Sequence, residues 1–303
     1  MTNEVVIDVN QSMITIGLLE DGKLAEYQRE SQSASFSVGN IYLARVKKPM
    51  PGLNAAFVDV GSEKEGFIHY QDLGPQFRTL AKYVKQQISD HKHLIPIDRF
   101  TFEPELSKEE TITDILTVGQ EILVQVAKEP ISTKGPRLTS DLSLPGRFMV
   151  LIPFQDKVSV STKIKSSEEK NRLKDIIKPI LPRNYGVIIR TSANGVGEEE
   201  LSRELHSLVK RWEACVGTLM KGKLPSLCYE ETNRATALLR DIFNPSFENI
   251  WVNDPATFNQ IKEYVGLIAP EKADVVQLYE EEIPILDKFA VTRQIKSSLG
   301  KTV

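Results

Sequence analysis

The chain has 303 residues, with 41% hydrophobic residues, 26% charged residues and a formal net charge of −3. This length can bury more than one hydrophobic core, so we expect two or three domains. The small negative charge excludes a protein held to nucleic acid by bulk electrostatics, so any such contact must use a local basic strip. Cys215 and Cys228 fit neither a CxxC zinc half-site nor a disulfide framework, and the sequence shows no signal segment or long apolar run. These features favour a cytoplasmic protein without a membrane span.

Three short strands are predicted at the start of the chain, over residues 5–9, 14–18 and 24–27. Apolar residues alternate in the first two, and Glu20 to Lys23 supply a turn to the third. The small and polar segment from Ser31 to Ser37 suits a connection to a second domain.

The segment from Asn40 to Leu73 alternates short strands with turns at Gly52 and Gly61. This pattern predicts a small antiparallel barrel, for which a five-stranded OB fold is the natural candidate. The second and third strands of such a barrel usually carry single-stranded nucleic acid, whose bases stack on aromatic side chains. Phe57 and Phe67 fall on those strands, so we predict RNA stacking on both; the alternative is that both rings fill the barrel core.

Two groups of basic residues could neutralise phosphates beside these rings. The first is Arg45, Lys47 and Lys48, and the second is Lys128, Lys134 and Arg137. The alternative for any one of them is an ordinary solvated charge.

Between the third and fourth barrel strands the sequence predicts a long loop over residues 74–113. Phe77, Leu80, Tyr83 and Val84 have helical spacing within it. The pair His91 and His93 could suggest a metal, but without a third ligand nearby it is more typical of an exposed loop.

After the barrel, residues 148–152 and 158–160 are interpreted as a hairpin. Ser166 and Glu169 form a predicted capping box at the start of a helix. Residues 185–191 are predicted to form a buried strand, and Glu198 is predicted to begin a long helix. From Thr232 the pattern alternates helix and strand, with Asp254 before a proline as an N-cap. This alternation predicts a mixed sheet covered by helices, which the first three strands extend into a split ribonuclease-H-like layout.

Short motifs run through most of the chain. They are Gly39-Asn40-Ile41-Tyr42, residues 55–61, Glu65-Gly66-Phe67, residues 119–126, Lys128, Lys134-Gly135, Leu138-Thr139, Leu144-Pro145-Gly146, residues 187–191 and Trp212-Glu213. In this order they closely resemble the bacterial ribonuclease E/G family, and the resemblance covers nearly all of the sequence.

The resemblance implies an α+β multidomain fold. Residues 1–36 and 231–303 would form a split ribonuclease-H-like α/β domain, residues 37–140 an S1 RNA-binding domain with an OB β-barrel, and residues 141–230 an α+β 5′-sensor domain. It also implies an endoribonuclease of RNA processing and decay that recognises single-stranded, 5′-monophosphorylated RNA.

A terminal phosphate needs a fixed guanidinium, a hydroxyl donor and free backbone N–H groups. Arg190 and Thr191 can present all three at the end of the strand over residues 185–191. By resemblance, Gly146 and Val150 would line the same pocket through their backbone.

One departure from the family pattern stands beside this pocket. Thr162 occupies a position where the family would have an arginine, and the neighbouring Lys163 lacks the planar fork of a guanidinium. Residues 198–200 are glutamates that repel an anion. The alternative for Arg190 is a surface salt bridge with one of them.

Cleavage of RNA with metal assistance requires a cluster of carboxylates around a divalent ion. Asp8 lacks recognisable partner acids, and the glutamates of residues 280–282 form a run that is more typical of a solvated face. In the family, the aspartates that bind Mg²⁺ lie in a DNase-I-like subdomain, and a cysteine pair beyond it shares zinc between subunits. Both would follow residue 303, so we expect this chain to bind RNA without cutting it or holding metal, and to form homo-oligomers only within the whole protein.

Two other hypotheses stay open. The chain could be a stand-alone RNA-binding adaptor, or an actin-like or ribonuclease-H-like phosphotransferase built around Asp8. The second lacks the glycines of a phosphate loop.

Overall fold

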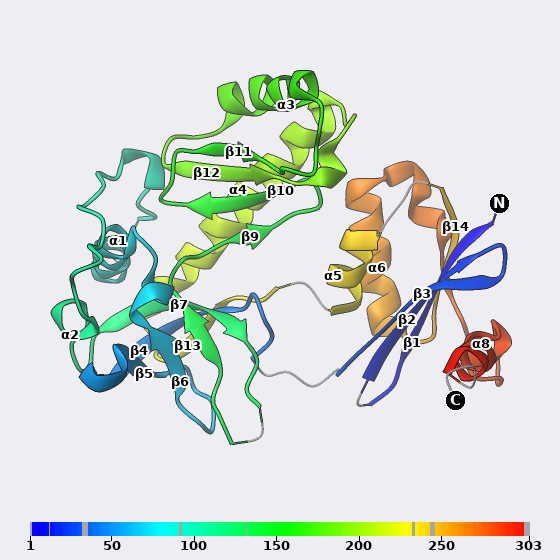
Figure 1. Ribbon diagram of the computed structural model, residues 1–303, viewed down its shortest axis with the longest axis horizontal. Helices are drawn as coiled ribbons and strands as arrows, with labels where there is room; N and C mark the ends of the chain where they lie inside the picture. Colours follow the sequence, from blue (N-terminus) through cyan, green and yellow to red (C-terminus); the bar gives the residue numbers. More distant parts are fainter. Residues whose placement is uncertain are drawn as a thin grey trace. The chain divides into compact units, whose positions relative to one another are not determined.

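The computed structural model describes residues 2–11, 13–31, 36–90, 93–131, 133–231, 234–242 and 246–299. The chain divides into two compact units (Figure 1). The first unit combines Met1–Ala34 with Thr232–Val303, and the second unit is Ser35–Glu231. The finer division into four segments remains a prediction.

A five-stranded mixed sheet forms the first unit, in the order β15-β14-β1-β2-β3. The strands β15, β14 and β1 run parallel, and β1, β2 and β3 run antiparallel. The predicted meander and the later alternation of helix and strand are therefore confirmed. The strands are β1 (Asn3–Val9), β2 (Met13–Glu20), β3 (Lys23–Ser31), β14 (Phe247–Val252) and β15 (Val276–Leu278), and the helices are α5 (Arg234–Ile242), α6 (Pro255–Ile268), η5 (Pro270–Val275), α7 (Ile285–Lys288) and α8 (Val291–Leu299).

Both faces of this sheet are covered, because alternate residues of β1 point to opposite sides. Val5 and Ile7 pack in one core with α5 and α6, whereas Val6 packs in another with α7 and α8. Asp254 caps α6 as predicted, since its carboxylate accepts a hydrogen bond of 2.7 Å from the N–H of Thr257.

A closed five-stranded barrel forms one part of the second unit, in the order β4-β5-β6-β8-β7 with β7 returning to β4. Only β6 and β8 run parallel among these pairs. The predicted OB-like barrel is thus confirmed, and a further strand, β13, extends it along β4. The elements are β4 (Ile41–Met50), η1 (Pro51–Leu53), β5 (Ala55–Asp59), β6 (Gly66–His69), η2 (Tyr70–Leu73), β7 (Glu121–Lys128), β8 (Arg137–Thr139) and β13 (Ser226–Tyr229).

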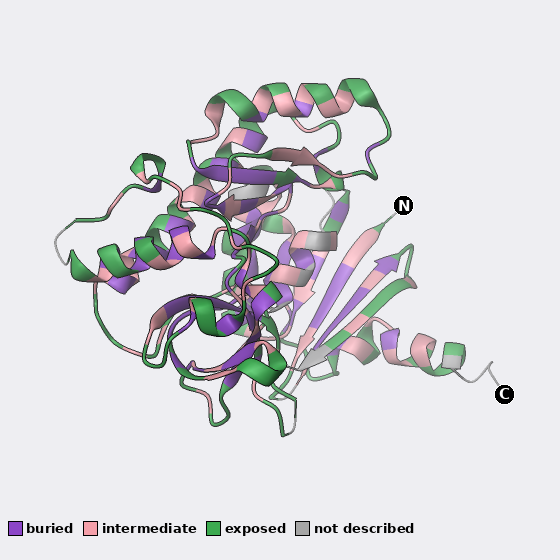
Figure 2. Ribbon diagram, turned by 60° about the vertical axis from the view of Figure 1, so that its left-hand side comes forward, coloured by how far each residue is buried: buried purple, intermediate pink, exposed green. Residues whose placement is uncertain are grey.

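The barrel interior is filled by one set of alternating side chains. Val58, Ile68, Val126 and Leu138, from four strands, are all buried there. Figure 2 shows the barrel strands largely in the purple of buried residues. Gly135 allows the chain to pass close to the neighbouring strand, because a Cβ atom at this residue would lie 2.0 Å from the carbonyl oxygen of Glu65. The barrel therefore needs glycine at the entrance to β8.

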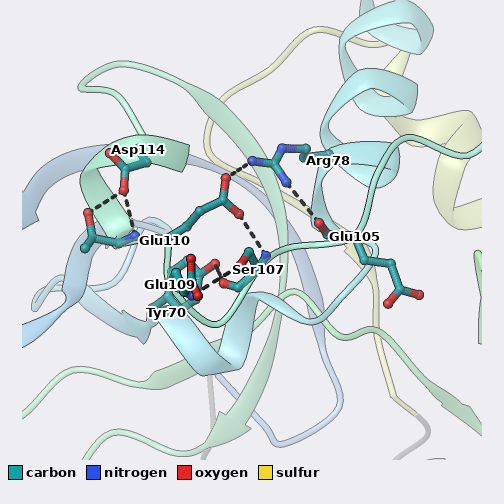
Figure 3. A network of polar contacts seen from close by, with 8 residues as sticks. Tyr70, Arg78, Glu105, Ser107, Glu109, Glu110 and Asp114 are labelled. Atoms are coloured by element: carbon teal, nitrogen blue, oxygen red, sulfur yellow. Dashed lines mark hydrogen bonds and ion pairs between the residues drawn. The ribbon is translucent and has the colours of Figure 1, made fainter.

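The long loop between β6 and β7 carries α1 (Phe77–Ser89), η3 (Ile97–Arg99) and α2 (Ile112–Ile115). The four apolar residues predicted to share a helix face are buried on α1, as expected. Arg78 on α1 forms an ion pair with Glu110 and donates to the carbonyl of Glu105, while the Tyr70 hydroxyl donates to the carbonyl of Ser107 at 2.6 Å (Figure 3). These contacts hold the loop against the end of β6.

A four-stranded sheet in the order β11-β12-β10-β9 forms the other part of the second unit. The predicted hairpin of residues 148–152 and 158–160 is wrong, because β12 lies between β10 and β11 and runs parallel to β11. Four of the five residues of β12 are buried, and both edges of the strand pair with a neighbour, as its central position requires. The elements are β9 (Leu144–Pro145), β10 (Met149–Pro153), β11 (Val158–Val160), α3 (Ser167–Ile180), β12 (Tyr185–Ile189), η4 (Thr191–Ala193) and α4 (Glu198–Leu219).

One hydrophobic core joins this sheet to the barrel. It contains Leu43 of β4, Tyr83 of α1, Leu151 of β10 and Trp212 of α4, all buried. Phe154 packs edge-on against both Tyr83 and Trp212. The barrel and the four-stranded sheet are therefore fixed to each other by packing within the second unit.

Candidate nucleic-acid interface

Five residues form a continuous row across the barrel, one from each strand. In register they are Lys48 of β4, Phe57 of β5, Phe67 of β6, Arg137 of β8 and Lys128 of β7. Residues that are directly opposite in a regular sheet point to the same face. The register shifts just before Lys48 in β4 and just before Lys128 in β7, at the two ends of the row. We call this set the barrel row; it places two aromatic rings between cations.

The two rings lie on the outer side of the barrel. Phe57 and Phe67 are half-buried, and their centroids are 6.0 Å apart with an angle of 69° between the planes. Their neighbours Val58 and Ile68 fill the interior instead. The alternative that both rings fill the barrel core is therefore wrong.

The cations of the barrel row differ in how they are held. The guanidinium of Arg137 is fixed by Asp72, with Nε–Oδ2 and Nη2–Oδ1 distances of 3.1 and 3.3 Å, while 48% of its side chain is exposed. Lys48 and Lys128 are exposed, and so is Lys134 in the turn between β7 and β8. A fixed guanidinium beside flexible ammonium groups suits a ligand with both flat bases and a charged backbone.

The first predicted basic group contributes one residue to the row. Lys47 lies 3.8 Å from a carboxylate oxygen of Asp59 and 3.6 Å from one of Glu65, and Arg45 lies 3.8 Å from Glu121. These pairs partly neutralise two of its three cations. The sequence alone could not show that Lys48, and neither Arg45 nor Lys47, belongs to the barrel row.

The second predicted site lies at the end of β12. Arg190 is half-buried, and its Nη1 donates to the carbonyl oxygen of Gly146 at 2.9 Å. Thr191 is exposed, and its hydroxyl lies 3.2 Å from that of Ser161. A hydroxyl and a guanidinium that are held at one strand end can bind a phosphate together.

Two neighbouring segments complete this region. Thr162 and Lys163 are exposed in the turn after β11, and the N–H of Lys163 donates to Ser161 Oγ at 3.3 Å. Val150 lies within β10, opposite Ile188, whose side chain is 42% exposed. The structure thus gathers the residues predicted for phosphate binding, from β10, the turn after β11 and the end of β12.

The turn over residues 146–149 stands at the centre of this region. Its backbone N–H groups at Arg147, Phe148 and Met149 donate to the carboxylate of Glu204 on α4, at 2.6, 2.8 and 3.0 Å. Burial raises the pKa of Glu204, and the three backbone hydrogen bonds oppose this rise. A Cβ atom at Gly146 would lie 2.7 Å from Cδ of Glu204, so only glycine lets the carboxylate approach.

The loop after Arg190 is fastened to α3. Glu169 accepts two hydrogen bonds of 2.7 Å from Arg172 and one of 2.8 Å from the N–H of Gly195. Arg172 also donates to the carbonyl of Val196. These hydrogen bonds, first that of Arg172, lower the pKa of Glu169 to about 2.

The predicted capping box is confirmed on one side only. Ser166 Oγ accepts from the N–H of Glu169 at 3.1 Å, but the carboxylate of Glu169 binds Arg172 and the 194–197 loop instead. The helix α4 begins at Glu198 as predicted, with exposed glutamates in its first turn.

Several residues of these sites were missed from the sequence. Glu204 did leave a signal, because it is a charged residue three positions after Leu201 and one before Leu205, within the apolar stripe of α4. A charge in such a stripe needs a specific partner. Asp72 and Ser161 left no comparable signal.

The candidate metal and phosphotransfer residues do not converge. Asp8 accepts a hydrogen bond of 2.7 Å from Asn253, and residues 280–282 are exposed. Within the described ranges, no three His, Cys, Asp or Glu side chains are grouped closely enough to hold a metal ion. His93 is exposed, and His91 lies outside the described residues.

Comparison with known proteins places the chain in one family. Residues 143–303 match the protein family described as Ribonuclease E/G. The chain belongs to the ribonuclease E/G family. The resemblance read from the motifs is therefore confirmed.

Named relatives match along almost the whole chain. Ribonuclease G of Haemophilus influenzae is 34% identical over 300 residues, and Ribonuclease G of Escherichia coli is 32% identical over 303 residues. These matches cover 99% and 100% of this chain, but only 57% and 58% of the relatives. Ribonuclease E of a Nostoc species is 34% identical over 273 residues, which are 88% of this chain and 35% of that relative. The chain thus spans a little over half of the length of the two ribonuclease G relatives.

Helices able to span a membrane are lacking from the described part of the chain, because none combines sufficient length with sufficient hydropathy.

Proposed function

We propose that this chain recognises single-stranded RNA and its 5′-monophosphate for an endoribonuclease of RNA processing and decay. The barrel row carries the proposal: two half-exposed rings lie side by side, with cations on both flanks. Bases that stack on such rings gain about 1–3 kcal/mol each, whatever their sequence. Lys48, Lys128, Lys134 and Arg137 would neutralise the phosphates between them.

The 5′ end would bind at the end of β12. A terminal phosphate carries close to two negative charges and three acceptor oxygens, which a guanidinium and a hydroxyl can meet. Arg190 and Thr191 would provide these groups, with Thr162 and Lys163 beside them and Gly146 and Val150 along the wall. Because Thr162 stands where the family would have an arginine and the adjacent Lys163 lacks a planar fork, we expect weaker phosphate binding than two guanidinium groups would give.

This proposal assigns the finer fold names as well. The barrel would be an S1-type RNA-binding domain over residues 37–140, the four-stranded sheet and its helices a 5′-sensor domain over residues 141–230, and the first unit a ribonuclease-H-like domain over residues 1–36 and 231–303. Two free cysteines, both buried, are compatible with the cytoplasm, where this RNA processing would occur.

We further propose that phosphodiester cleavage by the whole protein uses Mg²⁺. Among the described residues, no three His, Cys, Asp or Glu side chains are grouped closely enough to hold a metal ion; Asp8 accepts from Asn253, Glu169 from Arg172 and Glu204 from backbone N–H groups. The role that we assign to this chain is recognition of RNA.

A titration with two RNA oligonucleotides tests the function. They have one sequence and differ only in a 5′-monophosphate or a 5′-hydroxyl. We expect tighter binding of the monophosphate, by about 10-fold or more, as for hydrogen bonds to a charged group. Arg190→Ala should remove this difference and leave the binding of the hydroxyl RNA unchanged, whereas Phe57→Ala should weaken both RNAs equally.

Equal affinity of the unmodified protein for both ends would contradict the sensor assignment. Undiminished binding by Phe57→Ala and Phe67→Ala would contradict the stacking assignment. In that case the adaptor and nuclease hypotheses would both lose their proposed RNA surface.

A further inference from the structure

A chain of hydrogen bonds leads from helix α4 to the guanidinium of Arg190. It begins at Glu204, which lies in the apolar stripe of α4 and not among the exposed glutamates of its first turn. Its two carboxylate oxygens accept three consecutive backbone N–H groups, one on Oε1 and two on Oε2. Such a set of N–H groups is an anion-binding arrangement, and here an internal carboxylate occupies it.

The opposite side of the same turn holds the end of β12. The carbonyl of Gly146 accepts from Arg190 Nη1 at 2.9 Å, and the carbonyl of Phe148 accepts from the backbone N–H of Arg190 at 2.7 Å. The carbonyl of Arg147 accepts from the hydroxyl of Ser192. Three successive peptide units therefore donate to Glu204 and accept from residues 190–192.

This double attachment fixes the direction of the guanidinium. A planar fork binds phosphate well only when its orientation is set before the ligand arrives. The Gly146 carbonyl can set the orientation only while the turn keeps its shape, and Glu204 is the group that satisfies the N–H groups of that turn. Charge-assisted hydrogen bonds are about twice as strong as neutral ones, so a neutral side chain would hold the turn less firmly.

We propose that Glu204 is a positioning residue for 5′-phosphate recognition, acting through the 146–149 turn on Arg190. The proposal rests on the proposed sensor function of Arg190. Glu204 does not touch the phosphate; its carboxylate holds the turn whose Gly146 carbonyl aims the guanidinium. Loss of this carboxylate should therefore weaken the binding of a 5′-phosphate without changing the stacking of RNA on the barrel row.

The test compares Glu204→Gln, Glu204→Asp and Arg190→Ala in the full chain. Each protein is titrated with the monophosphate and hydroxyl oligonucleotides at a temperature where circular dichroism shows it folded. Glu204→Gln should bind the monophosphate RNA about tenfold more weakly, in the range that loss of a supporting hydrogen-bond partner causes elsewhere. It should bind the hydroxyl RNA as the unmodified protein does. Glu204→Asp keeps the carboxylate and should recover part of the preference.

Glu213→Gln is the matched control. Glu213 lies further along α4 and is exposed, so the variant makes the same change in charge without touching the turn or the first turn of the helix. It should keep the full preference for the monophosphate. A merely structural role of Glu204 would lower the melting temperature and affect both RNAs in parallel.

The outcomes separate the two proposals. If the unmodified protein prefers the monophosphate, Arg190→Ala loses that preference and Glu204→Gln keeps it, the positioning role is overturned while the sensor stands. If the unmodified protein shows no preference, both proposals are overturned. If Glu204→Gln does not melt cooperatively, Glu204→Asp decides: a reduced preference with unchanged hydroxyl binding supports the role, and a parallel loss for both RNAs overturns it.

Discussion

In the barrel row, strand pairing brings five residues side by side, whereas at the proposed phosphate site strand pairing is supplemented by side-chain hydrogen bonds of Glu204 and Arg190. Register fixes which residues of the row are neighbours, and alternation decides which face they occupy. At the phosphate site, the position of Arg190 depends on a carbonyl, and that carbonyl depends on a carboxylate from α4. The first arrangement should therefore tolerate surface changes that the second does not.

The largest expected effect would break the barrel itself. In Gly135→Ala the new Cβ would meet the backbone oxygen of Glu65 at 2.0 Å, and neither backbone can move without disturbing the pairing of β6 with β8. We expect the free energy of unfolding to fall by about 2–4 kcal/mol and the binding of both RNAs to fall with it. Chemical denaturation checks the stability.

Gly52→Ala is the control for this change. Its new Cβ has open space within 4 Å, so the free energy of unfolding should stay within about 0.5 kcal/mol of the original. Equal stability of the two variants would mean that the barrel does not need close approach at Gly135.

The next prediction compares two adjacent residues of β6, one in the barrel core and one in the barrel row. Ile68→Ala removes a fully buried side chain and should lower the free energy of unfolding by about 2–5 kcal/mol, while the folded protein still binds RNA. Phe67→Ala removes a half-buried ring and should cost less stability but weaken RNA binding by about 1–3 kcal/mol. Denaturation and RNA titration of both variants are the measurements. If Ile68→Ala mainly weakened RNA binding and Phe67→Ala mainly lowered stability, the assignment of the inner and outer faces of β6 would be wrong.

The smallest effect concerns acid and the loop beside Arg190. Because the pKa of Glu169 is about 2 in the folded protein against 4.5 ordinarily, its ionised form stabilises the fold above about pH 4.5. This contribution should disappear as the pH falls from 4.5 towards 2. The ion pair of Glu169 with Arg172 is partly exposed, so we expect it to contribute at most about 1 kcal/mol to the free energy of unfolding. Calorimetry between pH 5 and 2 should show a smaller loss of stability in Glu169→Gln than in the unmodified protein.

Glu199→Gln is a control for the loss of one carboxylate, since Glu199 forms an ion pair with Arg203 but its side chain is 88% exposed. Its free energy of unfolding at neutral pH should stay within about 0.5 kcal/mol of that of the unmodified protein. Identical acid curves for Glu169→Gln and the unmodified protein would instead show that the Arg172 pair contributes nothing.

The sequence predicted those helices and strands in which apolar or capping residues recur at a regular local spacing. Alternation around Phe57 predicted a barrel strand, the spacing of Phe77, Leu80 and Val84 predicted α1, and Asp254 predicted the start of α6. It failed for the hairpin after the barrel, because β10 and β11 have suitable patterns but nothing local says that β12 will enter between them. Such an insertion depends on pairing between segments that are far apart in the sequence, which no local pattern encodes.

By itself, then, the amino-acid order determined most strand and helix types and the family, and it predicted the residue types that binding of a terminal phosphate would require. Only the tertiary structure decided that Lys48 and Arg137 flank the two rings, and that Glu204 reaches the turn beside Arg190. The reason is physical: local periods act over a few residues, whereas a register between strands and a hydrogen bond across 57 positions exist only after the chain has packed.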